Sequence, residues 1–130
     1  MLANTYYEKA LSNLKTAKII YKMAANDDEQ LNIIGYHIQQ SIEFAIKHIL
    51  ALHGIAFQKT HDLDQLIVLA KNNGVELFLP EYLKEKADVI SLWETKTRYV
   101  IGFRVEQSRI EKALIELEKY FGTLSSIDEL

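Results

Sequence analysis

Three short groups of polar residues have types and spacings that could bind or transform a charged ligand. The first is Gln40, Glu43 and Lys47, which share one stripe of a helix because they are three and four residues apart. Glu43 precedes Lys47 in the favourable order for an ion pair, which if exposed contributes only about 0.3–0.5 kcal/mol. The stripe is therefore either a solvated helix face or one wall of a polar cleft.

The second group is Thr60-His61-Asp62-Leu63, at the start of a predicted helix. A histidine titrates near neutral pH, so His61 beside Asp62 could transfer a proton. The alternative is a structural role, in which Thr60 caps the helix and the segment anchors the preceding loop. The other histidines show no spacing typical of metal ligands and cysteine is absent, so no metal site is predicted. No phosphate-binding glycine loop is present, and we expect no cofactor.

The third group is Lys96-Thr97-Arg98-Tyr99. An arginine can bind a phosphate or a carboxylate through two parallel hydrogen bonds, and Tyr99 could stack on a base or donate its hydroxyl. The alternative is that Arg98, near a helix C-terminus, pairs with Glu94 one turn earlier on the same helix. The spacing alone does not distinguish these two interpretations of Arg98.

Composition indicates one domain covering residues 1–130. The chain has 48% apolar residues, enough for a core, and its net charge of −3 gives no sign of a nucleic-acid footprint across the whole chain. The N-terminal residues lack the basic and apolar regions of a signal peptide, and no apolar run is long enough to cross a membrane. We expect a cytoplasmic protein without a membrane segment.

Apolar periodicity predicts an all-α fold, an up-and-down bundle of four to five antiparallel helices. Its central helix is Leu31–His53, which we expect Asp28 to cap, and Thr5 with Glu8 forms a capping box before the first helix. The apolar stretch at 75–79 is predicted to be a loop, because a lone strand would have no partner. The core spans about 5–124, and the tail 125–130 is expected to fray. The helices are predicted at about 6–25, 31–53, 61–73, 80–99 and 105–124.

Taken in order, these pieces resemble the HEPN domain (higher eukaryotes and prokaryotes nucleotide-binding). The resemblance is carried by a long first helix, HIQQSIEFAIKHIL at 37–50, THDL at 60–63, TRY at 97–99 and a closing helix. It implies a helical bundle similar to the substrate-binding helical domains of nucleotidyltransferases. It also implies a homodimer, often encoded beside a minimal nucleotidyltransferase in a toxin–antitoxin-like system.

Several members of that family are toxin ribonucleases that cleave RNA without a metal. In these an arginine is followed, after four to six residues, by a histidine at the dimer interface. Arg98 matches the arginine, but positions 103, 104 and 105 hold Phe103, Arg104 and Val105, and every histidine precedes Arg98. General acid–base cleavage needs a titrating group near neutral pH, so this departure favours binding over cutting.

We therefore expect a homodimeric module that binds a nucleotide, an RNA end or a partner nucleotidyltransferase. Its predicted ligand-binding residues are Arg98, Tyr99, Glu43, Lys47 and Gln40, with Glu43 orienting Arg98 through an ion pair.

Around that site, His61 and Asp62 would brace the start of the third helix, and Phe44 and Phe103 could line the subunit contact. One alternative is a degenerate metal-independent ribonuclease that uses Arg98 with His61. A second is an interaction protein whose dimer face alone acts, as an antidote or scaffold.

Overall fold

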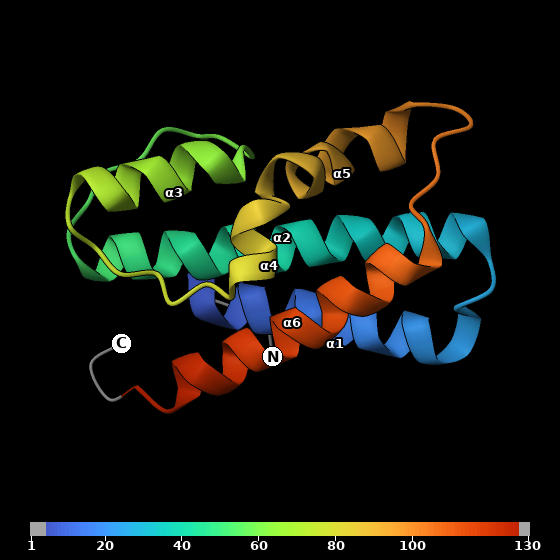
Figure 1. The fold of residues 1–130 in the computed structure, drawn as a ribbon, viewed down its shortest axis with the longest axis horizontal. Coiled ribbons are helices and arrows are strands. Elements are labelled where there is room, and N and C mark those ends of the chain that lie inside the picture. The colour runs from blue at the N-terminus through green and yellow to red at the C-terminus, as the bar shows by residue number, and fades with distance from the viewer. Residues whose placement is uncertain (1–4, 128–130) are drawn as a thin grey trace.

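The computed structural model describes residues 5–127, which form helices and loops and contain no strand. The helices pack around one core (Figure 1). No helix in this described range has the length and apolarity needed to cross a membrane. The helices are α1 (Tyr6–Ala24), α2 (Asp28–Leu52), α3 (Leu63–Asn72), α4 (Glu81–Glu85), α5 (Ala87–Tyr99) and α6 (Gln107–Ser125).

Short-range capping contacts set where the first two helices begin. The Thr5 hydroxyl accepts a hydrogen bond from the Glu8 backbone N–H at 3.0 Å, which confirms the predicted N-cap of α1. α2 is capped by Asp27, whose carboxylate accepts from the N–H groups of the second and third residues that follow it. The predicted cap Asp28 is instead the first residue of α2, one position further on.

The central helix of the bundle is α2, with α3 and α5 on one side of it and α1 and α6 on the other (Figure 1). Its apolar stripe, spaced at three and four residues, is fully buried at Ile34, Ile38, Ile42, Ile46 and Ile49. The all-α bundle predicted from periodicity is thus confirmed.

α2 also comes close to the loop after α5. A Cβ built on Gly35 would lie 3.4 Å from the Val105 and Ile110 side chains, so α2 packs closely against both at this glycine. Asn32 donates to the Phe103 carbonyl at 2.8 Å and accepts from the Val105 N–H at 3.0 Å. These contacts hold the loop that connects α5 to α6.

Several boundaries differ from the sequence-based expectation, among them the start of α2, which lies three residues before the predicted Leu31, and the start of α6, which lies two residues after the predicted 105. The helix predicted at 80–99 is divided at Lys86 into α4 and α5, and α3 begins at Leu63, two residues later than predicted. α6 includes Ser125, just past the predicted core limit, and residues 128–130 of the predicted frayed tail lie outside the described range. The stretch 75–79 is a loop, as predicted.

Candidate functional site

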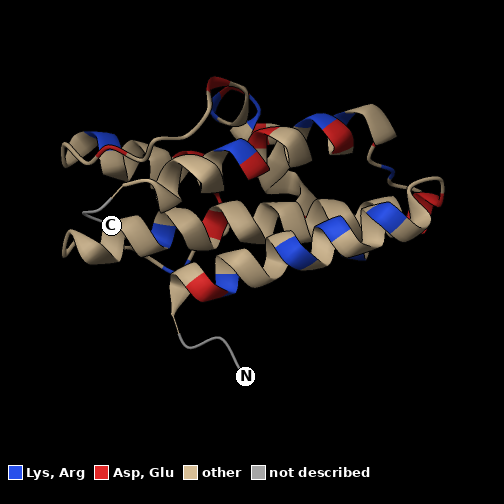
Figure 2. Cartoon of the chain, turned by 90° about the horizontal axis from the view of Figure 1, so that it is seen from below, with Lys and Arg blue, Asp and Glu red and all other residues tan. Residues whose placement is uncertain are grey.

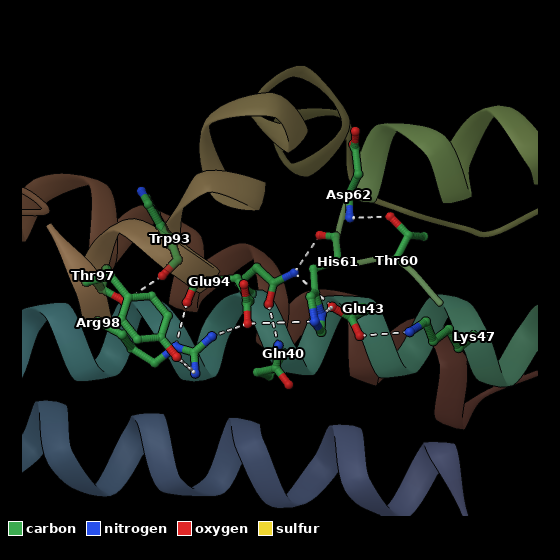
Figure 3. Close-up of polar contacts among 12 residues, drawn as sticks. Gln40, Glu43, Lys47, Thr60, His61, Asp62, Trp93, Glu94, Thr97 and Arg98 are labelled. Atoms are coloured by element: carbon green, nitrogen blue, oxygen red, sulfur yellow. Dashed lines mark hydrogen bonds and ion pairs between the residues drawn. The ribbon is translucent and has the colours of Figure 1, made fainter. Parts of the chain in front are cut away.

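A buried carboxylate, Glu43, lies in the middle of α2 and is only 1% exposed. Its Oε2 accepts from Lys47 Nζ at 2.9 Å, one turn along the same helix. Its Oε1 lies 2.9 Å from His61 Nδ1 and accepts from Gln39 Nε2 at 3.0 Å (Figure 3). A carboxylate removed from water is tolerated only when it is paired and hydrogen-bonded, and here both oxygens are. The stripe of Gln40, Glu43 and Lys47 is thus not a solvated face.

The loop before α3 places His61 against this carboxylate. The His61 backbone carbonyl accepts from Gln39 Nε2 at 2.9 Å, and Gln40 in turn donates to Gln39 Oε1 at 2.6 Å. An ionised carboxylate only accepts hydrogen bonds, so Nδ1 carries the proton that it shares with Glu43. Nε2 is the other ring nitrogen, and the His61 side chain is 50% exposed.

A second buried carboxylate, Glu94 on α5, receives Arg98. The Arg98 Nη2 pairs with Glu94 Oε1, and Arg98 Nε donates to the Glu94 backbone carbonyl at 2.8 Å. The guanidinium carbon lies 4.8 Å from the ring centroids of both Tyr36 and Tyr99, and Nη1 donates to the Tyr99 hydroxyl at 3.3 Å. Arg98 therefore lies within cation–π distance of two aromatic rings, which is a favourable arrangement.

His61 connects the two carboxylates. Its Nδ1 contacts Glu43, and its Nε2 lies 3.8 Å from the Glu94 Oε1 that also binds Arg98. We call Glu43, Lys47, His61, Glu94 and Arg98 the polar cluster (Figure 3). The charges of its two carboxylates balance those of Lys47 and Arg98. The polar cluster is therefore neutral when the His61 imidazole is neutral, and it carries one positive charge when the imidazole is protonated.

The predicted ion pair between Glu43 and Arg98 is wrong. Arg98 pairs with Glu94, one turn earlier on α5, while the Glu43 oxygens are occupied by Lys47, His61 and Gln39. The spacing of Glu94 and Arg98 had offered this pair as the alternative. Gln39 and Glu94 complete the network. Their spacing in the sequence indicates both contacts, because Gln39 precedes Glu43 by four residues and Glu94 precedes Arg98 by four residues.

Asp62 holds the start of α3 and does not enter the polar cluster. Its carboxylate accepts from the Asp64 and Gln65 backbone N–H groups at 3.0 and 3.4 Å, so Asp62 is the N-cap in place of the predicted Thr60. The Thr60 hydroxyl accepts from the Asp62 N–H at 3.1 Å. In Figure 3 the Asp62 carboxylate points away from Glu43.

The predicted ligand-binding residues divide into an accessible and a buried set. The Arg98 side chain is 37% exposed and Tyr99 is 70% exposed, so both can touch a ligand. The buried set is Gln40, Glu43 and Lys47, which support the accessible residues from the interior of the bundle. Within residues 5–127, no group of three or more histidine and acidic side chains is placed to hold a metal ion.

A family model of the HEPN domain matches residues 3–125, nearly the whole chain. This protein therefore belongs to the HEPN domain family, which confirms the resemblance carried by its short motifs. Membership supports a nucleotide-binding or ribonuclease-like module. No curated protein and no solved structure matches the chain.

Proposed function

We propose that this protein is a homodimeric module that binds a nucleotide or an RNA end at the accessible edge of the polar cluster. The observation that supports this most is Arg98, whose guanidinium contacts the rings of Tyr36 and Tyr99 while a third of its side chain is open to solvent. As in the family systems it resembles, the module would act in the cytoplasm beside a minimal nucleotidyltransferase, as part of a toxin–antitoxin-like pair.

Arg98 is preorganised for a phosphate. A guanidinium has five N–H groups, and Arg98 uses one on Nε, one on Nη2 and one on Nη1 within the protein. Two N–H groups remain for phosphate oxygens, and the rotamer that offers them is already fixed by Glu94 and the two rings. The exposed face of Tyr99 provides a stacking surface for a base next to that phosphate.

Fluorescence polarisation with a labelled single-stranded RNA tests this proposal. Charge-assisted hydrogen bonds contribute about 1.5–3 kcal/mol, so Arg98→Ala should weaken binding about ten-fold or more. The matched control is Arg109→Ala, which removes an exposed arginine from α6 and should bind like wild type. Arg98→Lys keeps the charge but loses the planar fork, so it should recover only part of the affinity. Equal affinity of wild type and Arg98→Ala would remove Arg98 from the site.

A specific observation supports a second candidate, a metal-independent ribonuclease that uses Arg98 with His61. The histidine that the ribonuclease motif places after the arginine is missing, but His61 Nε2 and Arg98 both approach Glu94 Oε1. RNA cleavage needs a base for the 2′-hydroxyl and an acid for the leaving 5′-oxygen, and one imidazole is only one of these in a given protonation state. Binding is therefore our first proposal.

Incubating structured RNA with excess protein in chelator separates the two candidates. Cleavage that is lost in His61→Ala and in Arg98→Ala, but kept in the control His53→Ala, would establish the enzyme. His53 is a suitable control because it is an exposed histidine at the end of α2, outside the polar cluster. Absence of cleavage alongside Arg98-dependent binding would support the binding module alone. Co-purification of a nucleotidyltransferase that is unaffected by Arg98→Ala would instead favour a pure interaction protein.

A further inference from the structure

An apolar groove of about 790 Å³ runs between α1 and α6. It lies on the side of α2 opposite α3 and α5, away from the polar cluster (Figure 1). Leu11, Ile19 and Ile115 line this groove and are 38%, 54% and 46% exposed. The buried Leu14 and Leu114 also line it. An exposed apolar surface with charged edges is typical of a protein–protein contact.

The two walls of the groove carry opposite charges. Lys15, Lys18 and Lys22 line it from α1, and Figure 2 shows basic positions recurring along the helix that begins beside the N-terminus. Glu111 and Glu118 line it from α6. All five residues are exposed, so both walls present their charges to solvent.

Much of this charge is available to a partner. Lys18 Nζ lies 3.5 Å from Glu118 Oε1, and Glu111 accepts one hydrogen bond from a tyrosine of α1 at 3.0 Å. A carboxylate has about four acceptor sites, so neither glutamate is saturated by these contacts. Within residues 5–127, Lys15 and Lys22 have no ion-pair partner.

The walls decide what kind of segment can fill the groove. Both are α-helices, whose backbone N–H and C=O groups are already paired along the helix, so the groove offers no backbone partners. An extended segment would lose its hydrogen bonds to water on entering and would find none in return. A helix satisfies its own backbone, and its side-chain ridges fit the groove between two other helices. The groove therefore suits a helix.

We infer that the groove binds an amphipathic helix of a partner protein, with an apolar edge, acidic residues along one flank and basic residues along the other. The acidic flank would face the lysines of α1, and the basic flank would face the glutamates of α6. From Leu11 to Lys22 α1 rises about 17 Å, so the contact would extend over about three turns. The groove is separate from the polar cluster, and this inference goes beyond the proposed nucleotide or RNA site.

Opposite charges on the two walls also fix the direction of the bound helix. Turning a helix end over end keeps its apolar edge in the groove but exchanges its flanks. Only one of the two directions therefore places acids against α1 and bases against α6. A helix that is acidic on both flanks would be repelled by α6, and one that is basic on both flanks would be repelled by α1.

Fluorescence polarisation of the full chain with three labelled peptides tests this inference. Each peptide is about 14 residues long, or four helical turns, and all have the same leucine edge. The mixed peptide has one glutamate flank and one lysine flank, the acidic peptide has glutamate on both, and the basic peptide has lysine on both. The mixed peptide should bind about ten-fold tighter than the other two, because several exposed charge pairs change from attractive to repulsive. Ile115→Lys should weaken its binding about ten-fold by placing a charge in the apolar contact.

Reversing the charge of one wall should change which peptide is preferred. Lys15→Glu/Lys22→Glu gives both walls a net negative charge, so this variant should bind the basic peptide several-fold tighter than the mixed peptide. The matched control Lys71→Glu/Lys86→Glu reverses two exposed lysines outside the groove and should keep the wild-type order of affinities. Circular dichroism of each variant establishes that these exposed substitutions leave the fold intact.

The predicted direction of the helix can be measured because the chain contains no cysteine. Met23→Cys, at an 82% exposed position near the end of α1, carries one nitroxide label, and the peptide N-terminus carries another. Exchanging the two flanks of the mixed peptide should reverse its direction. The distance between the labels, measured by double electron–electron resonance, should then change by about 15 Å. Equal distances for the two peptides would overturn the role of the charged walls.

Three results would overturn the inference and leave Arg98-dependent RNA binding unaffected. One is equal or absent binding of the three peptides. Another is an affinity for the mixed peptide that falls as the protein concentration rises, which would show that a second copy of the chain occupies the groove. The third is binding of phosphatidylglycerol vesicles by wild type but not by Ile115→Lys, which would assign the groove to a lipid surface.

Discussion

Replacing Glu43 by glutamine tests whether the polar cluster is an integral part of the core. The substitution keeps the length and shape of the side chain but removes its charge. Lys47 is left with an ammonium group whose side chain is 9% exposed and whose ion-pair partner, 2.9 Å away, is gone. The Phe57 ring, 5.7 Å from Lys47 Nζ, is the remaining favourable contact for this charge.

The size of the effect follows from this burial. Removing one partner of a buried ion pair costs about 3–5 kcal/mol, because the other charge stays buried without compensation. The contact with Phe57 is present before and after the substitution and cancels in the difference, so we expect a destabilisation of about 3–5 kcal/mol. This is a large fraction of the 5–15 kcal/mol that is typical of a folded domain.

Urea unfolding followed by circular dichroism measures this change. The matched control is Glu116→Gln on α6, whose carboxylate lies 3.1 Å from Lys112 and 3.5 Å from Lys119. Both of those lysines are well exposed, so the control should lose less than about 1 kcal/mol. The double variant Glu43→Gln/Lys47→Met should regain most of the stability, because the orphaned charge is removed.

Two results would refute this reasoning. One is a Glu43→Gln variant within about 1 kcal/mol of wild type, which would mean that water reaches Lys47 freely. The other is a double variant no more stable than the single variant, which would mean that the loss comes from Gln39 or His61 and not from the unpaired ammonium group.

Three further substitutions test contacts outside the polar cluster. Tyr120→Phe removes a donor 2.7 Å from the Leu77 carbonyl in a fully buried site, so urea unfolding should show a loss of about 1–3 kcal/mol; an unchanged midpoint would contradict this. Burial lowers the pKa of His37 below its usual 6.5, so the unfolded chain takes up a proton more readily and stability should fall as pH drops below about 6.5. His37→Asn should therefore lose less stability than wild type between about pH 7.5 and 5.5, and an equal loss would exclude His37 as the cause. Asp62→Ala removes the α3 cap and should cost about 1 kcal/mol in the same assay, whereas Asp62→Asn, which can still cap, should cost less.

Local sequence determined the helices and most of their ends. The apolar stripe of α2 recurs every three to four residues because that spacing keeps side chains on one face, so it could be read without coordinates. The Thr5 cap acts over three residues and could be read in the same way. The division at Lys86 could not, since the helical pattern continues on both sides of it.

The contacts within the site also fall into two kinds, those that the sequence indicates and those that only the tertiary structure decides. Glu43 with Lys47, and Glu94 with Arg98, are pairs four residues apart on one helix, so their spacing already indicates each pair. Their burial, the contact of His61 with both carboxylates and the position of Tyr36 beside Arg98 were decided by the tertiary structure. These groups lie on separate elements, and only the packing of α5 and of the loop before α3 against α2 brings them into contact.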